Sequence, residues 1–111
     1  MGTNEFRKGE KFNFSNSIDY ADKAVVSKHV LKSEMGNISL FAFDQGEGLS
    51  EHTAPFDAVV SLVDGQAEVI IDGVSHILDT GEAIVMPANI PHALKAIKQF
   101  KMVLTMIKSK G

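Results

Sequence analysis

The chain has 111 residues, of which 44% are hydrophobic and 23% are charged, a composition typical of one soluble globular domain. It has no cysteine, which excludes a disulfide scaffold, a thiolate nucleophile and every cysteine-based metal site. Its 14 acidic and 11 basic residues are scattered and give a net charge of −3, so we expect no concentrated positive surface and no nucleic-acid partner.

The amino-terminal residues are polar, and no apolar core of a signal peptide follows them. No apolar stretch approaches the ~20 residues that a helix needs to span a bilayer. We therefore expect a cytoplasmic protein with no membrane partner, folded as a single domain over residues 1–111. Residues 1–10 are expected to be loosely held, because chain ends seldom pack.

Short segments rich in β-branched and aromatic residues follow one another along the chain. They are residues 25–32, 38–43, 58–63, 67–71, 75–78, 83–86 and 100–107. Turn signals such as Asp64-Gly65 separate them. In the last segment Phe100 and Met102 alternate with Lys101, which is the period of a strand with one buried face.

Many short strands, with turn signals roughly every 8–12 residues, predict an all-β protein that is either a barrel or a sandwich. Closing the sheet into a barrel removes its exposed edges and leaves a central cavity. A small antiparallel β-barrel of the jelly-roll type is therefore the leading architecture. An immunoglobulin-like sandwich is the alternative, and the missing Cys–Trp–Cys pattern argues against it.

Two segments carry glycine, proline and histidine at fixed spacing. The first, residues 46–65, contains Gly46, His52, Ala54, Ala58 and Gly65. The second, residues 81–96, contains Gly81, Pro87, Asn89, His92 and Ala96. In order and spacing, these segments resemble the paired signature motifs of the cupin superfamily. The resemblance implies a small single-domain cupin of the bacterial type, whose fold is a jelly-roll barrel, also called a double-stranded β-helix.

The resemblance also implies where a metal would bind. Cupins typically hold one divalent transition metal, such as Zn, Ni, Mn, Fe or Cu, with two His and a carboxylate from the first motif and one His from the second. This sequence keeps His52 and His92 but has alanine at positions 54 and 58. Two imidazoles alone predict a partial site that binds metal weakly or not at all.

Asp57 is the acidic candidate nearest to these positions. Simple alternation points its side chain to the face opposite that of Ala58, whereas a bulge near Pro55 would turn it toward the cavity. Both orientations remain open on the sequence alone.

The expected ligand site therefore has His52 and His92 as its polar centre. The other candidate lining residues are Phe56, Asp57, Met86 and Met102, since small-molecule pockets are mostly apolar with a few polar groups. The alternative is that the apolar residues only fill the core and that the two histidines are buried and hydrogen-bonded.

Three functions are consistent with these features. The first is a cupin that binds a small organic molecule at a depleted metal site, with little or no catalysis. The second is a metal-dependent cupin enzyme of the oxygenase, isomerase or decarboxylase type that uses His52 and His92. The third is a structural or sensory module. Whether the protein is an enzyme stays open. The resemblance implies a homodimer, and an exposed strand edge that needs covering gives the same expectation.

Overall fold

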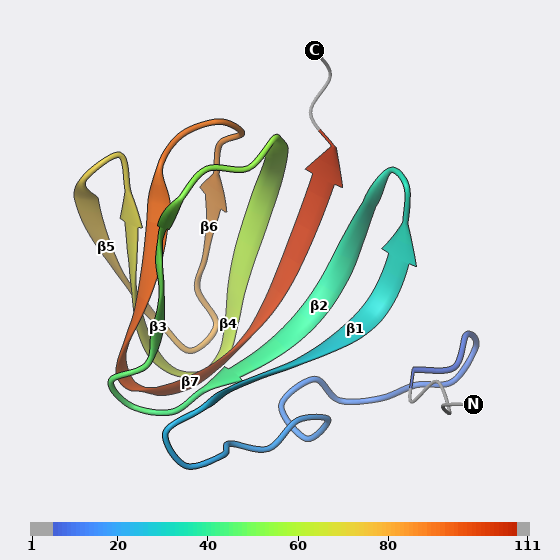
Figure 1. Ribbon diagram of the computed structural model, residues 1–111. Helices are drawn as coiled ribbons and strands as arrows, with labels where there is room; N and C mark the ends of the chain where they lie inside the picture. Colours follow the sequence, from blue (N-terminus) through green and yellow to red (C-terminus); the bar gives the residue numbers. More distant parts are fainter. Residues whose placement is uncertain (1–5, 109–111) are drawn as a thin grey trace.

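The computed structural model describes residues 6–108, and every regular element in this range is a β-strand (Figure 1). The strands are β1 (Val25–Ser33), β2 (Gly36–Phe43), β3 (Gly48–His52), β4 (Phe56–Ile71), β5 (Val74–Asp79), β6 (Ala83–Met86) and β7 (His92–Lys108). All of their pairings are antiparallel. No helix in the described residues is long and apolar enough to cross a membrane.

Strands β4 and β7 each belong to two layers. The first half of β4 pairs with β6 and with the last half of β7, whereas its second half pairs with β5 and with the first half of β7. The first layer has the order β1-β2-β7-β4-β6, and the second has the order β3-β7-β4-β5. Figure 1 shows the layers meeting at the bottom, where β4 and β7 bend, and diverging toward the top. This arrangement is an antiparallel jelly roll, as the sequence predicts.

The bend in β4 lies at Gly65. The pairing register of β4 with β7 shifts on both sides of this residue. Gly65 has φ +86°, and a Cβ atom there would lie 1.9 Å from the carbonyl oxygen of Gln99 on β7. Only glycine can occupy this position, because it combines a left-handed backbone with no side chain. The Asp64-Gly65 pair, expected as a turn between two strands, is instead a bend within one strand.

The interior lies between the two layers, and both layers contribute alternate residues to it. Its buried members are Phe43, Ala58, Val60, Leu62, Ala67, Val69, Leu78, Met86, Leu94, Ala96, Phe100 and Met102. Phe43 and Phe100 stack with their ring centroids 4.4 Å apart near the closed end. Toward the open end, Leu104 and Met106 are only partly buried.

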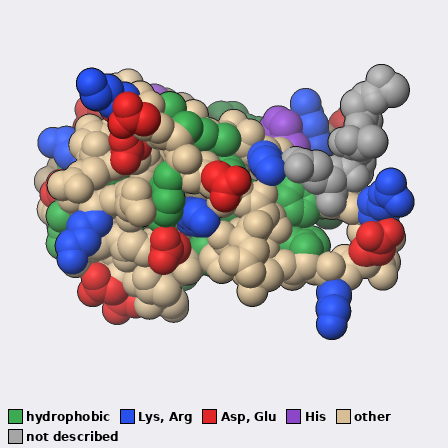
Figure 2. Space-filling model, turned by 90° about the horizontal axis from the view of Figure 1, so that it is seen from below, with side chains coloured by type: hydrophobic (Ala, Val, Ile, Leu, Met, Phe, Trp, Pro, Cys, Tyr) green, Lys and Arg blue, Asp and Glu red, His purple; other side chains and the backbone are tan. Residues whose placement is uncertain are grey.

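The segment before β1 covers the outer face of the first layer. Phe6 and Ile18 are buried there against Leu40 and Val103. Of the ten residues expected to be loosely held, residues 1–5 lie outside the described part of the chain, whereas Phe6 packs in this second core. Charges of both signs are interspersed on the face seen from the closed end (Figure 2).

Candidate functional site

His52 and His92 are side-by-side neighbours on adjacent strands at the open end. His52 ends β3 and His92 begins β7, and their Cα atoms are partners in the register. Their Nε2 atoms lie 3.1 Å apart, and the ring centroids are separated by 4.3 Å. His92 is buried, whereas His52 is exposed at the rim. The two rings therefore meet along one wall of the interior rather than across it.

A bulge in β3 turns His52 inward. The register of β3 with β7 is irregular between Leu49 and His52. These two residues are three positions apart, so strict alternation would place them on opposite faces. The bulge absorbs one residue, so that Leu49 pairs with Leu94 while His52 pairs with His92. Both Leu49 and His52 consequently line the same cavity.

The loop before His92 is fastened to the chain after His52. Asn89 has φ +65° at a position where cupins usually have glycine, and asparagine tolerates this left-handed conformation. Its backbone N–H donates to the carbonyl of Ala54 at 2.8 Å. This bond joins the two motif loops directly, so the position of His92 depends on the conformation of the β3–β4 loop.

Backbone carbonyls set the tautomer of both rings. The Nδ1 atom of His52 lies 2.7 Å from the carbonyl oxygen of Ser50, and that of His92 lies 3.1 Å from the carbonyl oxygen of Ile90. A carbonyl oxygen only accepts hydrogen bonds, so each Nδ1 carries a hydrogen atom and donates it. In the neutral rings both Nε2 atoms are then acceptors that face each other. Metal-binding histidines are oriented by the same kind of bond.

The histidine pair forms the polar end of a small apolar cavity with a volume of about 50 Å³. The other lining residues are Leu49, Ala54, Phe56, Ala58, Met86, Leu94, Leu104 and Met106. A cavity of this size holds a few water molecules or a small chemical group, and it is well below the ~300–1,000 Å³ of a drug-sized pocket. Among the residues that the structure describes, no carboxylate lines it, and His52 and His92 are its only ionisable side chains.

A larger groove of about 590 Å³ lies over β3 and the first part of β7. Its lining includes Glu47, Glu68 and Lys95. Lys95 and Glu68 are register partners on the outer face of the second layer. The groove is open and contains neither histidine of the pair, so we place the candidate site in the smaller cavity.

The structure places the six candidate ligand residues in three groups. His52, His92, Phe56 and Met86 line the cavity. Met102 is completely buried one row deeper in the core, so it is not among the lining residues. Asp57 is exposed on the opposite face, and its carboxylate accepts a hydrogen bond from the backbone N–H of Ala88 at 2.9 Å. The bulge that would turn it inward is absent from the register of β4 at this point.

Within the described residues, no third histidine or carboxylate joins His52 and His92 as a candidate metal ligand. No cluster of three or more histidine, aspartate or glutamate side chains that could hold a metal occurs within residues 6–108. The spacing of the pair is nevertheless compatible with one shared metal ion. The two Nε2 atoms lie 3.1 Å apart. With metal–nitrogen bonds of ~2.1 Å, they would subtend an angle of about 95° at the ion. Ala54 and Ala58 line the cavity beside the pair, at the positions where the resemblance implies further ligands.

The comparison with known families decides which family the chain belongs to. Residues 39–108, well over half of the chain, match the family model described as the cupin domain. The chain is a cupin. No curated protein matches this cupin.

A conserved protein of unknown function from Streptococcus pyogenes is 30% identical to this cupin with a TM-score of 0.88, over 95% of this chain and 92% of that one. A cupin 2 conserved barrel domain protein from Leptotrichia buccalis is 37% identical with a TM-score of 0.85. That match covers 87% of this chain but only 47% of the other protein. A cupin superfamily protein from Desulfitobacterium hafniense is 24% identical, with a TM-score of 0.87 over 94% of this chain and 95% of that one, which supports the fold alone.

Proposed function

We propose that this cupin binds a small organic molecule at the open end of its interior, with His52 and His92 as the polar anchor. The observation that carries the proposal is the convergence of the two Nε2 atoms at 3.1 Å on an otherwise apolar cavity. Two acceptors that face each other are satisfied by a group that donates a hydrogen bond to both or by a cation between them. A ligand hydroxyl group would supply such a donor, with its one hydrogen atom shared between the two nitrogens.

The apolar lining supports binding of a carbon skeleton next to that group. Leu49, Leu104 and Met106 are only partly buried, so a ligand would remove further apolar surface from water. Pockets that combine a mostly apolar wall with a few polar groups are typical of small-molecule sites.

The test is a ligand screen by NMR with organic acids and alcohols of two to ten carbons, and with amines of the same size as comparison ligands. We expect alcohols and hydroxy acids to shift the imidazole signals of His52 and His92. His92→Ala should remove this binding, whereas His76→Ala should retain it, because His76 is not a cavity-lining residue. Equal binding to the wild-type protein and the His92→Ala variant would contradict the proposal.

Metal-dependent catalysis is the second candidate function. Two features favour it. The two Nε2 atoms, 3.1 Å apart, would subtend an angle of about 95° at one ion. The hydrogen bonds from each Nδ1 to a backbone carbonyl also orient both rings. A bound ion would act as a Lewis acid on a ligand oxygen. Metal analysis of the protein purified without an affinity tag distinguishes the two functions. One ion per chain that is lost in His52→Ala would favour the enzyme, whereas metal-free protein after incubation with Mn, Fe, Ni, Cu and Zn would favour simple binding.

We further propose that two copies associate through β1. Among the described strands β1 pairs only with β2, which leaves its other edge unpaired. Around the β1–β2 turn, Leu31, Met35 and Ile107 are exposed and border a groove of about 290 Å³ that extends from β1 over β2 to β7. Light scattering after size exclusion should give the mass of a dimer, and Met35→Glu should give a monomer. A wild-type monomer at every concentration would exclude this interface.

A further inference from the structure

A second cluster of polar side chains lies on the inner face of the first layer, opposite the histidine pair. Among residues 6–108 the buried polar side chains are those of His92 and Ser39. Ser39 lies on β2 in the first layer. Phe41, two residues farther on, belongs to the core between the layers, whereas Leu40 packs in the outer core under the amino-terminal segment. Alternation therefore places Ser39 on the inner face.

Ser39 connects two neighbouring side chains in one hydrogen-bonded chain. Its hydroxyl donates to Oδ1 of Asn37 at 3.5 Å, and its Oγ lies 3.3 Å from Nδ1 of His29 on β1. Both contacts are long and therefore weak. Within the described residues, Nδ2 of Asn37 and Nε2 of His29 have no hydrogen-bond partner. We call His29, Asn37 and Ser39 the β1–β2 polar patch.

The hydrogen bonds of the polar patch can be rearranged. When the Ser39 hydroxyl donates to Asn37, His29 donates to Ser39 from Nδ1 and its Nε2 atom is an acceptor. When the hydroxyl turns to His29 instead, Nε2 carries the hydrogen atom and becomes a donor. The amide of Asn37 offers two N–H donors in either case. The patch can thus present several donors to one ligand group.

The strand register connects the polar patch to the cavity. Ser39 is the Cα partner of Leu104, and Asn37 is the partner of Met106. Leu104 and Met106 line the cavity. Neighbouring strands lie about 4.8 Å apart. Asn37 and Ser39 therefore lie one strand away from the cavity-lining residues of β7, and His29 lies two strands away.

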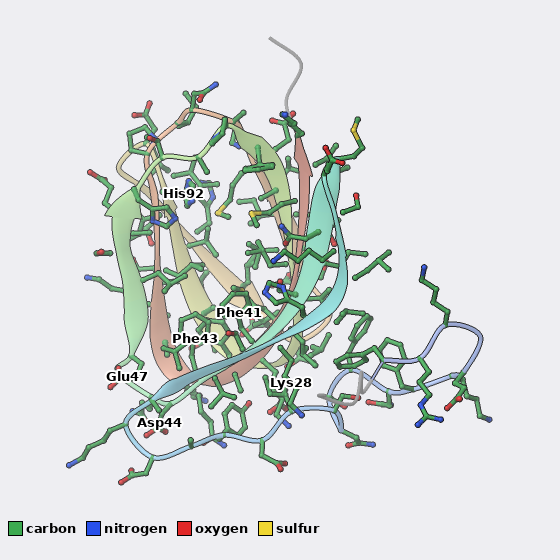
Figure 3. The ribbon with its side chains drawn as sticks, turned by 45° about the vertical axis from the view of Figure 1, so that its right-hand side comes forward. Lys28, Phe41, Phe43, Asp44, Glu47 and His92 are labelled. Atoms are coloured by element: carbon green, nitrogen blue, oxygen red, sulfur yellow. The ribbon has the colours of Figure 1, made fainter. Side chains whose placement is uncertain are left out.

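The polar patch and the histidine pair lie on the same side of β7. In the second layer β3, which carries His52, is next to β7, and in the first layer β2 is next to β7. The two groups therefore lie on facing layers, whose separation is about 10 Å where sheets pack and larger where the layers diverge toward the open end (Figure 1). Figure 3 shows His92 on one side of this gap and Phe41 of β2 on the other.

The geometry points to an elongated hydroxy acid as the ligand of the proposed site. Its hydroxyl group would share one hydrogen atom between the Nε2 atoms of His52 and His92. Its carbon chain would lie over Leu104 and Met106, and its carboxylate would accept hydrogen bonds from Asn37. This inference rests on the proposed small-molecule function. It explains why the 50 Å³ cavity is so small, since the cavity encloses only one end of the ligand.

The donor and acceptor pattern fixes this orientation. When both rings are neutral, the histidine pair has two Nε2 acceptors that an O–H donor would satisfy. Asn37 bonds Ser39 through Oδ1, which leaves its N–H donors for an acceptor such as a carboxylate. Within residues 6–108, no acidic side chain belongs to the cavity lining or to the patch, so these groups do not repel a carboxylate.

Isothermal titration calorimetry with three matched series of compounds, each with four to ten carbon atoms, tests the inference. The series are ω-hydroxy acids, the corresponding fatty acids without the hydroxyl, and the corresponding alcohols without the carboxylate. In the wild-type protein each missing group should weaken binding about threefold to tenfold, the effect of one hydrogen bond. Asn37→Asp keeps the shape of the side chain but replaces the amide donors with a negative charge. It should weaken the two acid series and leave the alcohols unchanged.

His52→Ala provides the converse comparison, because it should weaken the hydroxy acids and alcohols and leave the fatty acids unchanged. His76→Ala should alter none of the three series. If His52→Ala weakens binding but Asn37→Asp and His29→Ala leave every acid unaffected, the ligand does not reach the polar patch and this inference alone is wrong. If no series binds, or if His52→Ala changes nothing, the proposed function fails with it.

Discussion

The carboxylate of Asp57 accepts a hydrogen bond from the backbone N–H of Ala88 at 2.9 Å and so joins the start of β4 to the loop that presents His92. Asp57 is therefore a positioning residue and not a cavity residue. Asp57→Ala should lower the free energy of unfolding by about 1 kcal/mol, the value of one such bond. It should also reduce ligand or metal binding, because the loop before His92 loses one of its attachments.

Chemical denaturation and ligand titration would measure these two effects. Asp57→Asn, which keeps an oxygen acceptor at the same position, should restore most of the loss. Asp22→Ala serves as the control, since Asp22 is exposed and makes no side-chain hydrogen bond within the described residues. If Asp57→Ala and Asp22→Ala had the same small effect, the bond to Ala88 would have no positioning role.

Much of the fold could be predicted from the sequence because strand periodicity and motif spacing are local signals. The alternation in β7 and the spacing of the glycines, of Pro87 and of the two histidines are local patterns of this kind. The long strands could not be predicted in full. Asp64-Gly65 has the chemistry of a turn, and only the close approach of Gln99 shows that it is a bend.

The candidate site was predicted in part for the same reason. The motif positions identify His52 and His92, but their register depends on a bulge between Leu49 and His52 that has no turn residue to mark it. The polar patch could not be predicted at all. Ser39 and Leu104 are 65 positions apart and become neighbours only through the pairing of β2 with β7.

The close backbone contact at Gly65 predicts that alanine at this position destabilises the protein more than alanine at Gly81. Gly65→Ala combines a left-handed backbone with a Cβ atom 1.9 Å from the carbonyl oxygen of Gln99, so it should destabilise the protein by more than about 3 kcal/mol. Gly81→Ala is the matched control, because Gly81 has φ +92° but no atom within 4 Å of an added Cβ. It should cost only the backbone strain of about 1 kcal/mol. Equal losses in thermal or denaturant unfolding would show that the contact with Gln99 relaxes.

The two alanines in the cavity predict how metal binding can be restored. Ala54→His and Ala58→Glu together would add the two ligands that cupins typically place there, beside a pair already oriented by backbone carbonyls. We expect the double variant to bind Zn²⁺ or Ni²⁺ at least about tenfold more tightly than the wild-type protein. Adding His92→Ala to the double variant should abolish the gain. An affinity that stays at the wild-type level would show that the β3–β4 loop and the start of β4 do not hold positions 54 and 58 in a ligating geometry.

The contact between Tyr20 and Asp64 leads us to expect a loss of stability at alkaline pH. Its hydroxyl donates a hydrogen bond to Asp64 at the bend of β4. Burial raises the pKa of Tyr20 well above its usual value near 10, and the hydrogen bond to Asp64 and the negative charge of that carboxylate raise the pKa further. Because the folded-state pKa is the higher one, the stabilisation is complete below about pH 10 and is lost as the pH rises above that value.

Denaturant unfolding between pH 8 and pH 11 measures this effect as the difference between the wild-type protein and Tyr20→Phe. Above pH 10 the wild-type free energy of unfolding should fall more steeply, by up to about 1.4 kcal/mol per pH unit, since the unfolded chain loses the tyrosine proton first. Asp64→Asn should reduce the difference, because it removes the negative charge while keeping an oxygen acceptor. Parallel curves for the wild-type protein and Tyr20→Phe would show that the contact between Tyr20 and Asp64 does not hold the amino-terminal segment against β4.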